Sequence, residues 1–411
     1  MHEGVSAQRG ARVALYSHDT MGFGHVRRNL LIARALAAPP LCAEVLLIAG
    51  MREAGAFGMP AGVDCLTLPA WRKDENGGYR PRSLGCDAAT LASLRSATIQ
   101  AALQRFEPDL FIVDNVPCGA MGELSPVLQA LSRRGRTRCV LGLRDVLDEP
   151  SAVRRQWWKQ RAFEAVHRHF AAVWVYGDGR LYDTATEYGF DADIRSKLQY
   201  LGYLDQHARL GDGVAPPSEV DPYVLCAVGG GQDGAHTALA FAEAGPPEGH
   251  RAVIVTGPFM PADARARLAA IAAGDPRLTV REFVPDGTSL LHGAARAVVM
   301  GGYNTVMEVL SFGTPALVVP RVAPRREQII RAERLAALGL LDMLHPDELS
   351  PQRLGAWLHG RRAPPRPARE VLDLDALERL PHAAAQLLAQ RRSPAASVAA
   401  AAMKGRSHAY G

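Results

Sequence analysis

The sequence lacks most of the features that mark secreted, membrane-spanning or zinc-binding proteins. Its six cysteines are scattered over 411 residues and form no Cys-x-x-C pair, so neither a zinc knuckle nor a redox motif is indicated. No run of about 18 apolar residues occurs, so no transmembrane helix is expected. Residues 1–12 are polar and lack the apolar centre of a signal peptide. We therefore expect buried free thiols in a cytoplasmic protein, with contact to the inner face of the membrane left open.

A strong excess of one charge is missing as well. The formal net charge is +5 and charged residues make up 22% of the chain, which is too weakly basic to indicate nucleic acid as a partner. Apolar residues make up 48%, an ordinary value for a globular protein. A chain of this length is expected to form two or three domains, each with its own core.

Short apolar runs alternate with helical segments along the whole chain, and the pattern restarts after a Gly- and Pro-rich segment at 211–217. The predicted strands lie at 12–17, 43–49, 110–113, 139–143, 173–176, 223–228, 252–256, 278–282, 297–300 and 316–319. Such alternation predicts parallel sheets covered by helices on both faces. We therefore predict an α/β protein with two Rossmann-like, doubly wound domains that face each other across a cleft.

The domain boundaries follow from the linker and from a Pro- and Arg-rich segment at 361–367. We predict an N-terminal domain at 1–210, a C-terminal domain at 218–360, a C-terminal helix at 361–392 and a disordered tail at 393–411. Pro381 should kink that helix or split it in two. The helix is expected to cross back toward the N-terminal domain.

The stretch 300–340 carries the strongest functional signal. A buried strand ends in Gly301-Gly302, and a helix is expected to open at Asn304-Thr305, with Glu308 in its first turns. Glycines allow a ligand to approach the backbone, and a helix N-terminus offers free N–H groups and positive dipole charge to an anion. A carboxylate one turn further on can accept hydrogen bonds from ribose hydroxyls. The stretch therefore predicts a nucleotide site, with a structural role for Glu308 at the helix dipole as the alternative.

A glycine turn follows the first predicted strand, where doubly wound sheets place their ligands. The segment runs from Ser17 to Arg28 and lacks the Gly-x-Gly-x-x-Gly spacing of dinucleotide sites. His25 follows the turn near the helix start, where a neutral imidazole can act as a general base. A structural histidine that caps the turn is the alternative. His18 and Asp19 are weaker candidates for ligand contact or catalysis.

Two further segments are candidates for binding an anionic ligand. The turn Gly229–Gly234 links a strand to a helix at the start of the second half and can cradle an anion through its backbone N–H groups. Arg325 and Arg326 precede another helix, where cationic charge opposes the helix dipole. A role in ligand binding explains them better than helix stability does, although a solvated charge run stays open.

These segments resemble the GT-B glycosyltransferases, and most closely the MurG-like family of the peptidoglycan enzyme that adds N-acetylglucosamine to lipid I. The matches are strongest at 16–36, 226–236 and 283–340. A subgroup of predicted glycosyltransferases is more similar still, because it shares the start at Ser17, the loop from Gly22 to Arg28 and the pair Arg144-Asp145. The resemblance implies the GT-B fold, a nucleotide-sugar donor in the C-terminal half and an acceptor in the N-terminal half.

The resemblance also implies roles for individual residues. It places His25 near the acceptor and the donor phosphates, Phe283-Val284 at the uracil, Glu308 at the ribose and Glu327-Gln328 at the donor sugar. Gly231 stands where the family has a serine, Asp233 is an extra residue before Gly234, and Glu327 stands for a glutamine. The predicted catalytic residues are His25, Asp19 and Asp145. The predicted donor-binding residues are Gly230, Gly231, Gln232, Asp233, Gly234, Phe283, Val284, Gly301, Gly302, Asn304, Thr305, Glu308, Arg325, Arg326, Glu327 and Gln328. The predicted acceptor-side residues are His18, Gly22, Gly24, Arg28, Asp114, Asn115 and Arg144, with a structural ion pair as the alternative for Arg144 and Asp145.

Two Asp-x-Asp triplets, at 191–193 and 373–375, match the metal-binding motif of the other main glycosyltransferase fold. Both lie outside a glycine turn at a strand end, so we expect no metal and no cofactor. The segment 153–170 combines tryptophans with arginines and is expected to be a helix packed on the sheet, with a membrane or lipid-acceptor contact as the alternative.

The sequence therefore predicts an inverting, metal-independent glycosyltransferase that uses a nucleotide-sugar, with a UDP-sugar such as a UDP-N-acetylhexosamine as the expected donor. The acceptor, a glycan, a lipid-linked molecule or a small molecule, is open, and nucleic acid is not expected. Two alternatives are a nucleotide-sugar epimerase of the same fold and a non-catalytic partner that binds a nucleotide-sugar.

Overall fold

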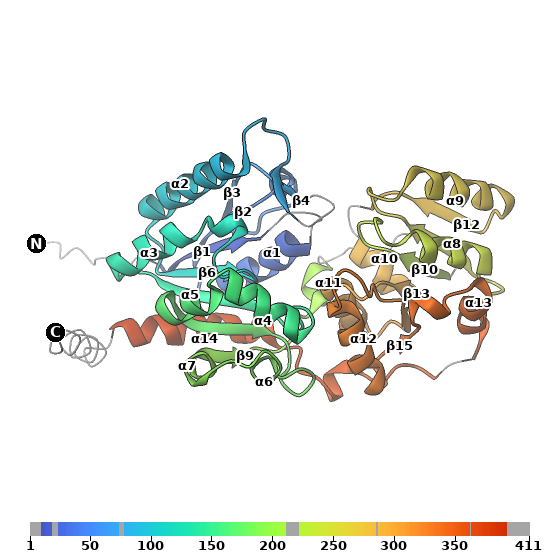
Figure 1. Cartoon of the computed structure of the whole chain (residues 1–411). Coiled ribbons are helices and arrows are strands. Elements are labelled where there is room, and N and C mark those ends of the chain that lie inside the picture. The colour runs from blue at the N-terminus through green and yellow to red at the C-terminus, as the bar shows by residue number, and fades with distance from the viewer. Residues whose placement is uncertain are drawn as a thin grey trace, which may run out of the picture.

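The computed structural model describes residues 10–18, 24–73, 78–210, 222–284, 287–361 and 363–392. It has two lobes side by side, each a parallel sheet with helices on both faces (Figure 1). The predicted α/β class with two Rossmann-like domains is confirmed. The predicted linker at 211–217 and the tail at 393–411 lie outside the described residues.

The N-terminal lobe is built on a seven-stranded sheet in the order β3-β2-β1-β6-β7-β8-β9. Apolar side chains of the central strands are buried on both faces, as in all-parallel sheets. A separate antiparallel hairpin, β4 and β5, lies beside it. The strands are β1 (Arg12–Ser17), β2 (Glu44–Ala49), β3 (Val63–Thr67), β4 (Trp71–Lys73), β5 (Tyr79–Pro81), β6 (Leu110–Asp114), β7 (Arg138–Arg144), β8 (Phe170–Tyr176) and β9 (Leu198–Tyr200).

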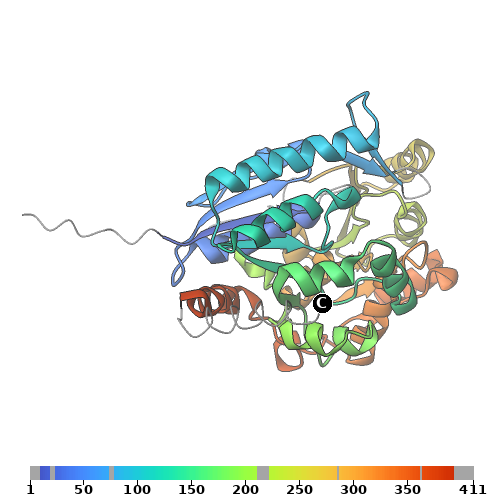
Figure 2. The same ribbon diagram turned by 60° about the vertical axis from the view of Figure 1, so that its left-hand side comes forward.

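The helices of this lobe lie over the two faces of its sheet (Figure 2). They are α1 (Gly24–Ala37), α2 (Ala88–Phe106), α3 (Ser125–Arg134), α4 (Pro150–Lys159), α5 (Ala162–His169), α6 (Thr184–Glu187) and α7 (Ala192–Lys197), with 3-10 turns η1 (Arg52–Ala56), η2 (Ala120–Gly122) and η3 (Gln206–Arg209). The basic segment that we expected as one helix is two helices, because Arg161 takes a left-handed φ of 52° between α4 and α5. Val153 and Trp157 of α4 and Val166 of α5 then face the core separately, where Phe170, the first residue of β8, is also buried.

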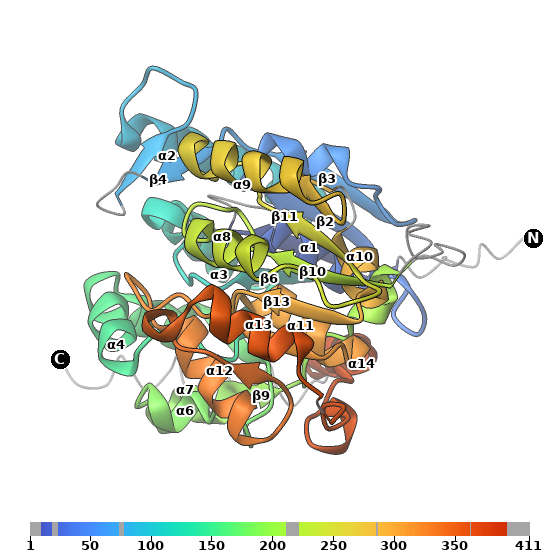
Figure 3. The same cartoon turned by 90° about the vertical axis from the view of Figure 1, so that its right-hand side faces the viewer.

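The C-terminal lobe has a six-stranded parallel sheet in the order β12-β11-β10-β13-β14-β15. Figure 3 shows its helices α8, α9, α12 and α13 in front of the N-terminal lobe. The strands are β10 (Tyr223–Ala227), β11 (Arg251–Val255), β12 (Leu278–Arg281), β13 (Arg296–Val299), β14 (Ala316–Val318) and β15 (Asp342–Met343). The helices are α8 (Ala235–Ala244), α9 (Ala262–Gly274), α10 (Gly287–Gly293), α11 (Tyr303–Phe312), α12 (Glu327–Ala337) and α13 (Pro351–His359), with 3-10 turns η4 (Pro346–Glu348) and η5 (Ala368–Glu370).

The chain ends in a helix that returns to the N-terminal lobe. This helix, α14 (Ala376–Arg392), packs against α1, and Leu204 pairs with Asp375 just before it. The predicted helix at 361–392 is therefore too long, since α14 begins only at Ala376 and the described residues 363–375 before it contain one short 3-10 turn, η5. The alternative that Pro381 splits the helix is wrong, because Leu380 and Ala384, on either side of Pro381, are fully buried in the core and hold one continuous helix.

Candidate active site between the lobes

The candidate residues gather where the carboxyl ends of the N-terminal strands face the C-terminal lobe. His18 follows β1, Asp114 ends β6 and Arg144 ends β7, while α11 and α12 begin on the opposite side. This edge is where open parallel sheets place their ligands. Asp19 and Gly22 lie outside the described residues, so their predicted roles stay predictions.

His25 and Asp114 form a hydrogen-bonded pair at this edge. His25 Nδ1 lies 2.6 Å from Asp114 Oδ2, and Arg28 donates to Asp114 Oδ1 at 2.5 Å. Burial by itself would raise the pKa of Asp114, but the guanidinium of Arg28 and the ring of His25 hold it well below its usual range. Because Asp114 is ionised, it can only accept, and Nδ1 must carry the proton. The lone pair of neutral His25 therefore resides on Nε2.

The first turns of two helices from different lobes meet beside this pair. The side chain of Asn304, in the first turn of α11, donates to the carbonyl oxygen of Gly24 at 2.7 Å. A Cβ on Gly24 would lie 2.8 Å from Asn304 Nδ2, so glycine is needed for this close approach. Both helix N-termini carry positive dipole charge and free N–H groups. Their convergence favours an anion between the lobes.

Tyr303 and Arg331 lock the lobes together next to these helix starts. The Tyr303 hydroxyl donates to the carbonyl oxygen of Tyr176 at 2.9 Å, and the guanidinium carbons of Arg28 and Arg331 lie 5.6 and 5.5 Å from the centroid of its ring. Arg331 donates to both carboxylate oxygens of Asp145, at 2.8 to 3.1 Å, and is fully buried. Tyr203 also donates to Asp145.

The catalytic role that we expected for Asp145 does not fit this arrangement. Its carboxylate is 1% exposed and both oxygens are occupied, so it cannot reach a substrate. The structural ion pair, the alternative for this residue, is what the structure shows. Arg144 differs from its neighbour, because no described carboxylate lies within ion-pair distance of it, and its side chain reaches a pocket described below.

The glycine turn at 229–234 is shaped by backbone contacts with the loop after β11. Gly231 has a φ of +87°, and a Cβ there would lie 2.1 Å from the carbonyl oxygen of Thr256. Gly257 approaches the turn in the same way, since a Cβ at this position would lie 2.3 Å from the carbonyl oxygen of Gly229. This packing explains why glycine replaces the serine of the family pattern. Gly234 follows as the N-cap of α8, and a Cβ there would collide with Val228.

Arg321 ties together three of the predicted donor-side residues. It donates to Asp233 at 3.2 Å and to Glu327 at 2.8 Å, and its backbone N–H donates to the side chain of Gln328 at 2.9 Å. Gly301 lies against Gln328, with a Cβ position 3.0 Å from Gln328 Cβ. The sequence analysis missed Arg321, although its place three residues after the end of β14 was a usable signal.

Glu308 lies on α11 and is 8% exposed. Its Oε1 accepts hydrogen bonds from Arg209 and, at 3.0 Å, from Thr288. These partners come from η3 and α10, so Glu308 also helps to hold the end of the N-terminal lobe. Phe283 and Val284 follow β12, with Phe283 49% exposed and Val284 packed against the core. The predicted ribose and uracil contacts of these residues stay predictions.

The remaining predicted residues lie near helix starts. Gly302 is the N-cap of α11, Thr305 is in its first turns, and Arg326 is the N-cap of α12. The backbone N–H of Arg326 donates to Asp148 Oδ1 at 2.8 Å, and Arg325 lies 4.0 Å from the same carboxylate. Asp148 thus supplies negative charge at the start of α12, which offsets the unfavourable cations there. Sequence reasoning missed Asp148, which comes from the other lobe.

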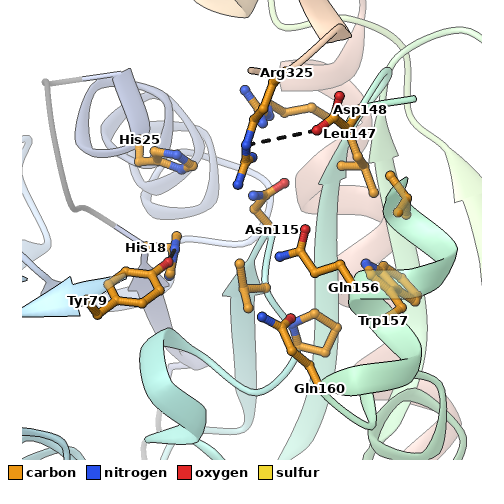
Figure 4. A pocket seen from close by; sticks show the side chains of 14 residues that line it. His18, His25, Tyr79, Asn115, Leu147, Asp148, Gln156, Trp157, Gln160 and Arg325 are labelled. Carbon is orange, nitrogen blue, oxygen red and sulfur yellow. Dashed lines mark hydrogen bonds and ion pairs between the residues drawn. The ribbon is translucent and has the colours of Figure 1, made fainter. Parts of the chain in front are cut away.

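A small pocket opens between these elements, with a cavity volume of about 80 Å³. His18, His25 and Tyr79 lie on one side, and Gln156 and Trp157 of α4, with its C-cap Gln160, lie on the other (Figure 4). Asn115 lies between them, and Arg325 and Asp148 lie at the C-terminal lobe's end. Of the acceptor-side candidates, His18, Asn115 and Arg144 line this pocket together with His25.

Both Asp-x-Asp triplets serve the fold. Asp191 caps α7 and, with Asp193, pairs with His167, while Asp373 and Asp375 pair with arginines of the C-terminal segment. Within the described part of the chain no three His, Cys, Asp or Glu side chains form a group suited to a metal ion. No described helix is long and apolar enough to cross a bilayer.

The comparisons with known proteins agree with the fold described above. Residues 250–371 match the model of the glycosyltransferase family 28 C-terminal domain. No curated protein sequence matches the chain. MurG of Acinetobacter baumannii is 14% identical in sequence, with a TM-score of 0.53, over 93% of this chain and 100% of that one.

Two plant enzymes have the same fold. A UGT of Glycyrrhiza uralensis complexed with glycyrrhetinic acid 3-O-monoglucuronide is 12% identical, with a TM-score of 0.60, over 97% of this chain and 99% of that one. A UGT of Siraitia grosvenorii in complex with UDP is 14% identical, with a TM-score of 0.52, over 93% of each chain.

The fold and the matched domain define the class: the protein is a glycosyltransferase of the GT-B fold. Within that class, the C-terminal domain is of the family 28 type, and the MurG-like resemblance of the sequence is confirmed.

Proposed function

We propose that the protein is an inverting, metal-independent glycosyltransferase that transfers a sugar, such as an N-acetylhexosamine, from a UDP-sugar to a hydroxyl bound in the pocket beside His25. The observation that carries this proposal is the His25–Asp114 pair at 2.6 Å, on the wall of a pocket that reaches the C-terminal lobe. The domain match at residues 250–371 supports a nucleotide-sugar donor, and so does the neighbour that contains UDP.

The chemistry is a single displacement. His25 Nε2 takes the proton of the acceptor hydroxyl as its oxygen bonds to the anomeric carbon, and the bond from that carbon to the diphosphate breaks. The imidazolium that forms is stabilised by Asp114, which Arg28 and Asn29 hold in place through hydrogen bonds at 2.5 and 3.3 Å. A general base of this kind contributes roughly 10²- to 10⁴-fold to the rate.

Fixed groups of the chain stabilise the negative charge that develops on the leaving diphosphate. The first turn of α11 provides N–H groups and dipole charge, and Asn304 must release Gly24 to admit the phosphates. Arg321 would then hold Glu327 and Gln328 toward the donor sugar. We assign the uracil to Phe283, which follows β12, and the ribose to Glu308, in the middle of α11.

A thermal-shift panel of nucleotides and nucleotide-sugars tests the donor assignment. A ligand at 100 times its dissociation constant stabilises the folded protein by about 2.7 kcal/mol, so UDP and one UDP-sugar should raise the melting temperature where ADP-, GDP- and CMP-sugars do not. Glu308→Ala should reduce that shift in melting temperature. Glu333→Ala, at an exposed position of α12, is the control and should leave the shift unchanged. No shift with any uridine nucleotide would refute the proposal. A UDP-sugar that is converted to its epimer without release of UDP would establish the epimerase alternative instead.

A further inference from the structure

The pocket beside His25 has walls of amide, imidazole and guanidinium groups. Gln156 lies on α4 and Gln160, one helical turn further on, is the C-cap of that helix, so their amides lie on the same face and line the pocket beside Trp157 (Figure 4). The Trp157 ring is fixed by stacking on Phe190, with ring centroids 5.2 Å apart and planes at 25°. Amides beside an indole suit a hydroxylated ring with one apolar face, and suit an extended apolar molecule poorly.

Asn115 adds an unused acceptor to this wall. Its Oδ1 is buried and has no hydrogen-bond partner among the described residues. A buried polar atom left unsatisfied costs about 1–3 kcal/mol, so a ligand hydroxyl that donates to it is favoured. The left-handed backbone of Asn115, with a φ of 65°, directs the chain out of β6 at this point.

Two arginines, Arg144 and Arg325, and one carboxylate, Asp148, are among the residues that line the pocket. The Nε of Arg144 is buried without a hydrogen-bond partner, and no described carboxylate lies within 4 Å of the Arg144 side chain. Burial, with Arg28 and Arg331 nearby, lowers the pKa of Arg144 to about 10, which leaves it charged at neutral pH. Asp148 does not neutralise Arg144, because the carboxylate of Asp148 accepts a hydrogen bond from the backbone N–H of Arg326 and lies 4.0 Å from Arg325.

We propose that the acceptor is a hydroxyl-rich, carbohydrate-like molecule with an anionic group, a carboxylate or a phosphate, that binds Arg144 while a nearby hydroxyl faces His25. This assignment rests on the proposed glycosyltransferase function and gives its acceptor a chemical class. Arg144 and His25 line the same pocket, so one small molecule can reach both. Arg144 then determines specificity, since a planar guanidinium can bind a carboxylate or phosphate through two parallel hydrogen bonds.

Matched sugar probes test this inference. Methyl glucoside, methyl glucuronide and glucose 6-phosphate differ mainly in their charge and can be titrated calorimetrically against the protein with and without UDP. The wild type should bind at least one anionic probe about tenfold more tightly than the neutral one, a typical worth of one charge-assisted contact. The two anionic probes distinguish a carboxylate from a phosphate.

Variants assign the effect to Arg144. Arg144→Gln should remove the preference for the anionic probe, Arg144→Lys should keep part of it, and Arg134→Gln, at the exposed end of α3, should leave it unchanged. All three should bind UDP as the wild type does. The inference is overturned if no anionic probe binds better than methyl glucoside. It is equally overturned if Arg144→Gln weakens UDP instead, because Arg144 would then be a donor-phosphate contact.

The two proposals fail separately in this experiment. If the wild type does not bind UDP but prefers the anionic probe, the donor assignment is refuted and the proposed acceptor class is retained. UDP binding without any such preference would refute the acceptor class alone.

Discussion

The buried ion pair between Asp145 and Arg331 predicts that replacement of Arg331 alone strongly lowers the stability of the fold, whereas replacement of both partners does not. Arg331 makes contacts with Asp145 at 2.8 to 3.1 Å and also donates to the carbonyl oxygens of Gly301 and Val146, at 2.9 and 3.1 Å. Both side chains are 0 to 1% exposed. Arg331→Met therefore leaves a buried carboxylate whose remaining donors, among the described residues, are Tyr203 and the backbone N–H of Val146.

Removal of one partner of such a pair costs about 3–5 kcal/mol, whereas replacement of both by apolar residues is often neutral or stabilising. Arg331→Met should thus lower the free energy of unfolding by about 3–5 kcal/mol, and the double variant Asp145→Leu/Arg331→Met should recover most of that loss. Urea denaturation followed by circular dichroism measures both. A loss below about 1 kcal/mol in the single variant, or additive losses in the double variant, would refute the reasoning.

Three further outcomes are expected. The folded-state pKa of Asp114 is depressed, so its contribution is fully present above the unfolded value of about 3.9 and is lost as the pH falls further. The stability difference between wild type and Asp114→Asn, measured by urea denaturation from pH 3 to 7, should therefore be largest near neutrality and shrink below about pH 4; a constant difference contradicts this. Gly231→Ala places a Cβ 2.1 Å from a backbone oxygen and should lower the melting temperature, whereas Gly230→Ala, with 3.5 Å of space, should not. Burial raises the pKa of the Cys139 thiol to about 12, so a thiol reagent at pH 8 should label exposed Cys42 first and Cys139 only on unfolding.

The elements of the fold could be predicted because each has a local cause. Strands such as β1 and β13 are continuous apolar runs, and α11 starts after Gly302 and ends at Gly313, which takes the left-handed conformation that favours glycine. Pro381 shows the limit of local rules, since the packing of its neighbours keeps α14 continuous.

The parts of the site that sequence reasoning missed depend on contacts between distant residues. Arg331 lies 186 positions from Asp145, and Asp148 reaches Arg326 across 178 positions. The residues of these two pairs carry no local sequence signal, because a single arginine or aspartate can equally well be an exposed surface residue. Local position was informative for both His25, which follows the glycine turn near a helix start, and Asp114, which ends a strand, but only the fold reveals their pairing across 89 positions.

The most direct test of the central claim compares His25→Asn with the wild type for slow hydrolysis of the UDP-sugar, in which water takes the place of the acceptor. UDP binding and the melting temperature are measured on the same samples. The account predicts unchanged UDP affinity and a rate of UDP release reduced about 10²-fold or more, as expected for loss of a general base. A variant that binds UDP and releases it from the donor at the wild-type rate would contradict the account.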